Sequence, residues 1–289
     1  MERQFIKRDT KNQKLIAGGA LSPIVLDYIM DSEVPKPCRH FIGIEKDDMP
    51  KYLLFLENAF PYMDNYNYHK GMNGIIQELK GLLKTKNIGT DSVRALLLDF
   101  QATLETKPEK AIKLEKDALA QIENITADNA RLVSNLHANL GGLYRMNGHP
   151  DLAREHMEKS ISLLDQFNLL HINDSIPQIA NYAMFLTEQQ EPERGISELQ
   201  KLSGIIKEYH SDECLDYAKV QETLGTIYPM TANLSHAKTH FKKAFKIYEK
   251  IWADEPEMIE AKYQEIQELY PQVGSFPGQQ ISSSLTKQA

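Results

Sequence analysis

The sequence lacks several features that would place a protein in a class at once. It has only two cysteines, Cys38 and Cys214, which are too few for a disulfide framework. It has no apolar run of about 18 residues, the length needed to cross a bilayer. Its first residues carry charges but no apolar segment follows them, so they do not form a secretory signal. We therefore expect a cytoplasmic protein that does not enter a membrane.

An excess of positive charge and recognisable catalytic motifs are also missing. The formal net charge of −7 and the pI of about 5.8 disfavour broad nucleic-acid binding, which needs basic surface to neutralise phosphates. No GxxxxGK[ST] phosphate-binding motif occurs, and no Ser/His/Asp or Cys/His arrangement stands out. His236 and His240 are four residues apart on an expected helix, but no third ligand accompanies them, so we expect a solvated surface pair. We expect no enzymatic activity, no cofactor and no metal.

What the sequence does contain is an internal repeat with a period of 42 residues. Six positions recur at the same offsets in four registers, without a single insertion. The four registers are Leu98, Asp99, Ala102, Ala111, Glu115 and Ala118; Leu140, Gly141, Tyr144, Ala153, Met157 and Ser160; Tyr182, Ala183, Leu186, Gly195, Leu199 and Leu202; and Leu224, Gly225, Tyr228, Ala237, Phe241 and Ala244.

The recurring residues predict pairs of packed helices. Small residues at the second and fourth positions let two helices approach closely, and the fifth position is filled by a large residue between pairs. Apolar residues at three- and four-residue spacing indicate amphipathic helices. Turn signals separate the helices of each pair: Thr106–Lys107–Pro108, Asn147–Gly148–His149–Pro150, Glu191–Pro192 and Thr231–Ala232–Asn233.

The recurring Leu-Gly, Tyr, Ala, Phe and Ala resembles the signature of the tetratricopeptide repeat (TPR) family. The 42-residue spacing is similar to the longer form of the repeat found in kinesin light chains, and the match covers about residues 92–252. The resemblance implies an all-α fold, a right-handed superhelical solenoid of antiparallel helix pairs. It also implies a concave groove that binds a protein or peptide.

The remaining residues are expected to extend or flank this solenoid. Met49–Phe60 and His69–Leu83 form a divergent first pair, and a helix over Glu257–Tyr270 caps the last repeat, as a solenoid requires. The predicted face of the cap consists of Met258, Ala261, Ile266 and Leu269. We predict an N-terminal element at 1–48, a repeat domain at 49–270 and a flexible tail at 271–289.

The N-terminal element is expected to hold a small hairpin and a helix. Gln4–Ile6 and Lys14–Ala17 flank the polar turn Asp9–Asn12, and Ser22–Pro23 begins a helix. This order resembles the winged-helix end of STAND/NB-ARC signalling NTPases, although Ser22 stands where that family has His. The resemblance implies the sensing arm of a signalling protein. A capping element unrelated to that family is the alternative.

The groove is expected to be lined by polar residues near the small slot of each first helix. Asn side chains suit an extended peptide because each amide both donates and accepts hydrogen bonds. The resemblance adds that tetratricopeptide proteins hold peptide main chain with Asn at this slot, while hydrogen bonds to neighbouring helices or water are the alternative. The predicted groove residues are Asn135, Asn139, Arg145, Asn181, Lys219 and Thr223.

The first register has an apolar groove face instead. We predict that the N-terminal helices cover it, because an exposed apolar patch of this size is usually covered. An apolar peptide or a partner domain is the alternative occupant. The residues of this face are Val93, Leu96, Leu97, Phe100 and Leu104.

These patterns favour a protein- or peptide-binding scaffold, the ligand-sensing arm of a bacterial-type signalling protein. A carboxylate clamp for chaperone C-termini is disfavoured, because Asn181 and Lys219 match it but Ala138, Gly142 and Thr223 do not. A peptide-sensing regulator related to the quorum-sensing tetratricopeptide proteins is the alternative. That alternative needs a DNA-binding helix-turn-helix, for which residues 1–48 are too short.

Overall fold

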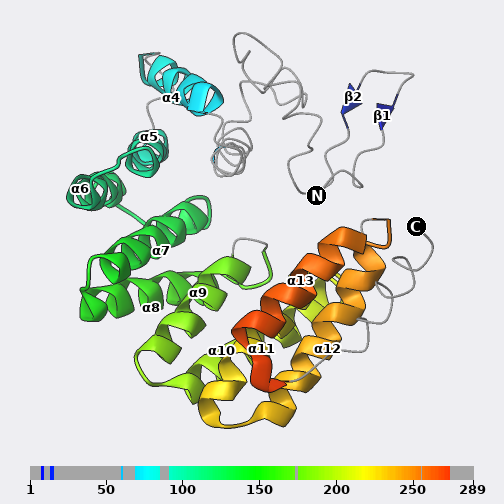
Figure 1. The fold of residues 1–289 in the computed structure, drawn as a ribbon. Coiled ribbons are helices and arrows are strands. Elements are labelled where there is room, and N and C mark those ends of the chain that lie inside the picture. The colour runs from blue at the N-terminus through cyan, green and yellow to red at the C-terminus, as the bar shows by residue number, and fades with distance from the viewer. Residues whose placement is uncertain are drawn as a thin grey trace. The chain divides into compact units, whose positions relative to one another are not determined.

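The chain is built from helices, with one short pair of β-strands near its start (Figure 1). The computed structural model describes residues 8–9, 14–15, 60, 69–84, 91–172, 175–254 and 256–273. Two compact units divide the chain, Met1–His149 and Pro150–Ala289. Within the described ranges, no helix is both long and apolar enough to cross a membrane.

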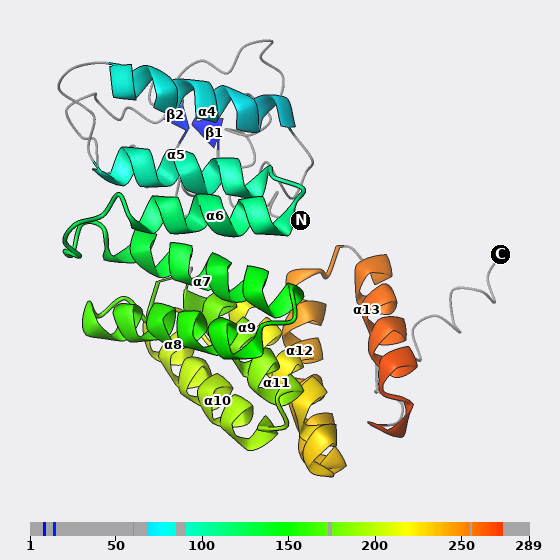
Figure 2. The ribbon, with the colours of Figure 1, turned by 90° about the vertical axis from the view of Figure 1, so that its left-hand side faces the viewer.

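The first unit contains β1 (Arg8–Asp9), β2 (Lys14–Leu15), α4 (His69–Lys84), α5 (Asp91–Thr103), α6 (Pro108–Leu119) and α7 (Ala130–Met146). Helices α4 to α7 form successive layers, and each contacts the next (Figure 2). The helix predicted at His69–Leu83 is therefore confirmed as α4. Its buried residues recur at helical spacing, as expected for an amphipathic helix: Met72, Ile75, Ile76 and Leu79.

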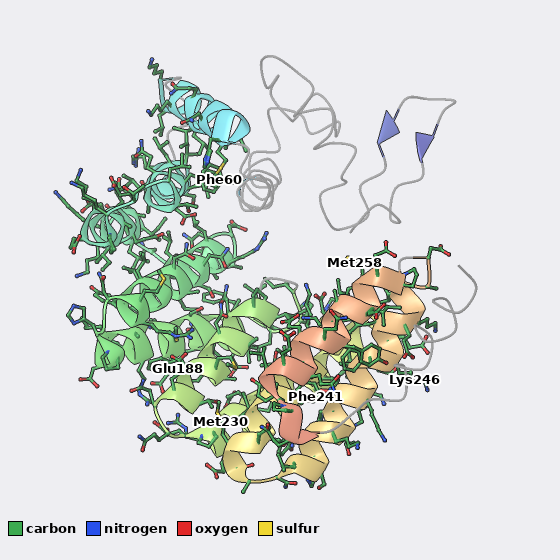
Figure 3. The ribbon with its side chains drawn as sticks, in the orientation of Figure 1. Phe60, Glu188, Met230, Phe241, Lys246 and Met258 are labelled. Atoms are coloured by element: carbon green, nitrogen blue, oxygen red, sulfur yellow. The ribbon has the colours of Figure 1, made fainter. Side chains whose placement is uncertain are left out.

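The apolar face of α5 is covered at three of its five predicted residues, while Leu97 and Leu104 are half-buried. Val93, Leu96 and Phe100 are buried. The ring of Phe60, labelled in Figure 3, stacks on that of Phe100 with centroids 3.9 Å apart. Phe60 ends the predicted helix Met49–Phe60 and is helical, while the rest of that helix lies outside the described residues. Burial by aromatic stacking removes this surface from the set of open ligand sites.

The predicted hairpin is confirmed, with a shift in its first strand. β1 and β2 pair antiparallel, with Arg8 opposite Leu15 and Asp9 opposite Lys14. Asp9 thus belongs to a strand and not to the turn, which leaves a four-residue connection of ordinary hairpin length. Gln4–Ile6, the helix at Ser22–Pro23 and the tail beyond residue 273 lie outside the described residues. The domain boundaries at 48 and 270 stay predictions.

The second unit contains α8 (Pro150–Gln166), α9 (Ser175–Glu188), α10 (Pro192–Tyr209), α11 (Leu215–Ile227), η2 (Tyr228–Thr231), α12 (Leu234–Ile251), α13 (Pro256–Leu269) and η3 (Pro271–Val273). α9 packs against α10, and α11 packs against α12, so these helices form two antiparallel pairs (Figure 1). One apolar core runs through both pairs and reaches Ile266 of α13. The predicted all-α helical repeat architecture is confirmed.

The 42-residue pattern corresponds directly to burial. Every recurring position in the four registers is buried except Leu98, which is half-buried. Close contact between helices explains why two of these positions are glycine. A Cβ atom on Gly195 would lie 2.6 Å from the carbonyl oxygen of Ala183, and one on Gly225 would lie 2.7 Å from the ring of Phe241. The two helices of a pair are closer at these points than any larger residue would permit.

The turns also follow the predicted signals. Pro108, Pro150 and Pro192 each stand at the first position of a helix, where the missing N–H costs nothing. Gly148 has a φ of 73°, the left-handed conformation that glycine adopts without strain. The side chain of Asn233 caps α12 by accepting a hydrogen bond from the N–H of His236 at 3.4 Å.

The predicted cap is confirmed as α13, and Ile266 of its predicted face is buried, but the rest of the buried face differs from the prediction. Tyr263 and Ile266 are buried, and the Tyr263 ring stacks on Phe245 of α12 at 4.0 Å between centroids. Ala261 and Leu269, which were predicted to pack, are exposed. An aromatic ring buries far more apolar area than an alanine does, and the Tyr263 face therefore prevails.

Two glycines of α10 are expected to respond oppositely to replacement by alanine. Gly195→Ala should lower the free energy of unfolding by at least about 1 kcal/mol, because the added methyl meets a backbone carbonyl. Gly204→Ala should raise it by about 0.5–1 kcal/mol, because its surroundings are open and alanine favours the helix. Urea unfolding followed by circular dichroism measures both. Equal effects of the two substitutions would contradict the close approach at Gly195.

Candidate functional site

The second unit presents two polar side chains on neighbouring helices. Asn181 lies on α9 and Lys219 on α11, both exposed, and these two helices contact each other. Within the described part of the chain, neither side chain has a hydrogen-bond or ion-pair partner. Thr223, the third predicted residue here, donates its hydroxyl to the carbonyl of Lys219 at 2.9 Å. Asn181 and Lys219 therefore retain their full capacity to bind a ligand, whereas the Thr223 hydroxyl proton is used within its own helix.

Helix α13 occupies the neighbouring part of α11. Lys262 pairs with Glu222 at 2.9 Å, and the same carboxylate accepts a hydrogen bond from the Tyr248 hydroxyl at 2.5 Å. Burial lowers the pKa of Lys262, but hydrogen bonds to Glu222 and Glu265 outweigh it and raise that pKa above its usual value. The Glu222 carboxylate is thus engaged by the fold itself.

The first unit holds the other three predicted groove residues on α7. Asn135 and Arg145 are half-buried, and each has an interaction partner within the chain. Asn139 is exposed, yet its amide nitrogen donates to Asp99 Oδ1 of α5 at 2.9 Å. For Asn139 the amide donor is therefore committed to a neighbouring helix. A ligand role for these three residues stays a prediction.

The carboxylate that Asn139 contacts belongs to a buried pair of carboxyl groups. Asp99 of α5 and Glu115 of α6 are 8% and 2% exposed and share a hydrogen bond with each other. Burial is the largest cause that raises the pKa of Glu115, to about 10, and the charge of Asp99 adds to it. Burial likewise raises the pKa of Asp99, to about 6, against the hydrogen bonds from Glu115 and Asn139. The pair therefore holds one proton at neutral pH.

This pair stands at two recurring positions of the repeat. Asp99 occupies the slot of Gly225, and Glu115 occupies that of Phe241, two residues that touch in the last register. A small-against-large apolar contact is thus replaced by a shared proton in the first register. The repeat pattern places both residues in their slots but does not predict their pairing. The signal in the sequence was two acidic residues, one at a position that is small in the other registers and one at a position that is large and apolar there.

Two further side chains, His240 and Cys214, have structural roles. The His240 ring is half-buried, with Nδ1 2.8 Å from Gln221 Oε1 and the ring stacked on Tyr228 at 5.1 Å. Burial lowers the pKa of His240 to about 4, so the expectation of a solvated residue is wrong here. Cys214 caps α11, where its Sγ accepts from the N–H of Tyr217 at 3.4 Å. The described residues contain no group of three side chains able to hold a metal ion.

Solved structures share this fold, although no protein-family model and no curated protein matches the sequence. BtubC (BKLC) from P. vanneervenii is 18% identical, with a TM-score of 0.57, over 80% of this chain and 89% of that one. A putative kinesin light chain from Podosopora anserina with nearly identical TPR-like repeats is 14% identical, with a TM-score of 0.51, over 71% and 98%. The apo form of RapI is 16% identical, with a TM-score of 0.51, over 79% and 65%.

At these identities the likeness concerns the fold. The chain has the tetratricopeptide-type helical repeat that the 42-residue pattern predicted. Its helix pairs, turns and close-packed small slots are those of such a repeat. The winged-helix resemblance of residues 1–48 receives no support from these structures.

The carboxyl pair predicts a specific dependence of stability on pH. Both pKa values are raised above the usual carboxyl value of about 4, so the folded state retains a proton that the unfolded state releases. The resulting stability is complete below about pH 4 and is lost as pH rises through about 6 and then about 10. Between pH 5 and pH 9, the free energy of unfolding should fall by at least about 1 kcal/mol.

Glu115→Gln should flatten this fall, because the amide donates to Asp99 at every pH. Glu109→Gln, on the exposed face of the same helix, is the matched control and should leave the slope as in the wild type. Urea unfolding across the pH range measures the three slopes. A wild-type slope that survives in Glu115→Gln would refute the shared proton.

Proposed function

We propose that the chain is a protein- or peptide-binding scaffold that acts by presenting a surface, without chemistry of its own. The observation that carries this proposal is the pair Asn181 and Lys219. Both side chains are exposed on adjoining helices, and neither has a partner within the described ranges. A repeat fold with uncommitted polar groups on its first helices is suited to recognising an extended chain.

The chemistry of the two side chains defines the kind of peptide. The Asn181 amide can donate to a main-chain carbonyl and accept from a main-chain N–H, which positions an extended segment. The Lys219 ammonium adds a charge-assisted contact to a carboxylate. The proposed ligand is therefore an extended segment that carries an acidic side chain or a free C-terminus.

The helices that carry these groups are fixed by core packing on their buried faces. Ala183 of α9 and Val220 and Leu224 of α11 are buried in the core of the second unit. Because the backbone of these helices is already fixed, a ligand does not have to order it on binding, which improves affinity. The proposal thus requires no rearrangement of the second unit.

We further propose that this scaffold is the sensing arm of a STAND/NB-ARC-like signalling protein of the cytoplasm. The support is the order of elements, a hairpin and a Ser-Pro helix signal ahead of the repeats, of which the β1–β2 pairing is described. The upstream reading frame provides the test. A phosphate-binding GxxxxGK[ST] motif there would support the arm, and an upstream frame without one would refute it.

Peptide binding through this face is testable with a random peptide library. Peptides enriched by phage display on the full chain should lose at least about tenfold in affinity to Asn181→Ala/Lys219→Ala, because a charge-assisted contact and two main-chain bonds are removed. Fluorescence anisotropy of the labelled peptides measures the dissociation constants.

The matched control removes the same residue types elsewhere. Asn124→Ala/Lys159→Ala alters an exposed Asn and an exposed Lys away from α9 and α11 and should bind as the wild type does. The proposal fails if no peptide is enriched, or if enriched peptides bind both double variants equally well.

A further inference from the structure

The second unit contains a cavity on a different side of α9 from Asn181. Its volume is about 490 Å³, within the range of small-molecule sites, and residues of α8, α9 and α10 line it. Much of the lining is apolar, with Ile161 from α8, Ile179 from α9 and Leu202 from α10. An occupant therefore needs an apolar body to replace the water that the cavity would otherwise hold.

Part of the cavity lining is a network of paired polar groups. The Tyr182 hydroxyl donates to Glu158 Oε1 at 2.6 Å, and Arg194 lies 3.3 Å from that hydroxyl and 3.5 Å from the carboxylate. Arg194 also pairs with Glu191. These groups satisfy one another, so they form a wall and do not call for a charged ligand.

Of the remaining charged residues in the lining, two are paired with each other and one is not. Lys201 pairs with Glu198 at 2.9 Å, so both cations of the lining, Lys201 and Arg194, are neutralised. Asp165 has no side-chain partner among the residues that the structure describes. It stands in the last turn of α8, where the carbonyl end of the helix adds further negative potential. The uncompensated charge of the cavity lining is therefore negative and belongs to Asp165.

We propose that this cavity binds an amphipathic ammonium, a ligand with an apolar body and one cationic head. The body occupies the space between Ile161, Ile179 and Leu202, and the head lies beside Asp165. An anionic ligand would meet three carboxylates, Glu158, Asp165 and Glu198, and only cations that are already paired. The ammonium can belong to a free amine or to a lysine of a partner, since the chemistry at the cavity is the same.

Three small molecules of one shape separate charge from apolar contact. Phenylbutylamine, phenylbutanol and phenylbutanoate share the same body and differ in the charge of the head group at pH 7. Isothermal titration of the full chain should give about two- to fivefold tighter binding for the amine than for the alcohol, and the weakest binding for the acid.

Two variants locate the binding. Asp165→Asn should remove the preference for the amine and leave alcohol binding unchanged. Ser162→Trp places a large side chain at an exposed position of the lining and should weaken all three ligands at least tenfold. Glu155→Gln, the same charge change on an exposed residue of α8 outside the lining, is the control and should keep the preference.

The source of the ammonium is distinguished by a blocked tetrapeptide that contains Phe-Lys. Tighter binding of this peptide than of phenylbutylamine would identify a lysine of a partner, and weaker binding would identify a free amine. The inference is overturned if the acid or the alcohol binds as tightly as the amine, if Asp165→Asn keeps the preference, or if Ser162→Trp binds the amine as the wild type does.

Discussion

The close contact of two paired helices at a small residue is the constraint on which the rest of this structure depends. At Gly195 the backbone of α10 meets a carbonyl of α9, and at Gly225 the backbone of α11 meets the ring of Phe241. No side chain fits between the helices at these points, so the register of each pair is fixed. Because the recurring positions that form these contacts return every 42 residues, each new pair exposes the corresponding face of its first helix.

One register satisfies this constraint by different chemistry. Asp99 and Glu115 take the places of a glycine and a phenylalanine, and they are held by a shared proton and by Asn139. An apolar contact tolerates any pH, whereas a buried carboxyl pair loses its proton as pH rises. The first unit therefore has a packing contact whose strength depends on pH. The corresponding contact in the second unit, between Gly225 and Phe241, does not titrate.

Local signals in the sequence were enough to predict the helices and their turns. Pro150 and Pro192 start helices because of their own fixed φ, and Gly148 turns the chain because it lacks a Cβ, so neither needs tertiary information. The carboxyl pair, the burial of His240 and the cavity beside Asp165 could not be predicted in this way. Each depends on side chains from different helices, such as His240 and Gln221, that meet only after packing. The face of α13 was misjudged because Tyr263 finds Phe245, 18 residues earlier in the chain, and no periodicity within α13 encodes that partner.

Helix α9 brings the two proposed binding surfaces together. Asn181 is exposed toward the proposed peptide, while the next residue, Tyr182, lines the cavity with its hydroxyl on Glu158. Both surfaces exist because α9 is fixed between α10 and α11 by the repeat contacts. A fixed helix that carries the uncommitted amide of Asn181 on one side and Tyr182 on another suits the two binding roles proposed above.

The central claim, that one 42-residue period is a complete structural unit, is tested most directly by removing one. Deletion of residues 175–216 takes out α9, α10 and the first two residues of α11, and joins the rest of α11 in the register of α9. Circular dichroism during urea unfolding should show a cooperative transition with helix content reduced in proportion to length, because each pair packs only on its neighbours. Deletion of residues 175–191, which removes α9 alone, should abolish the cooperative transition. Loss of cooperative unfolding in the full-period deletion would contradict the account.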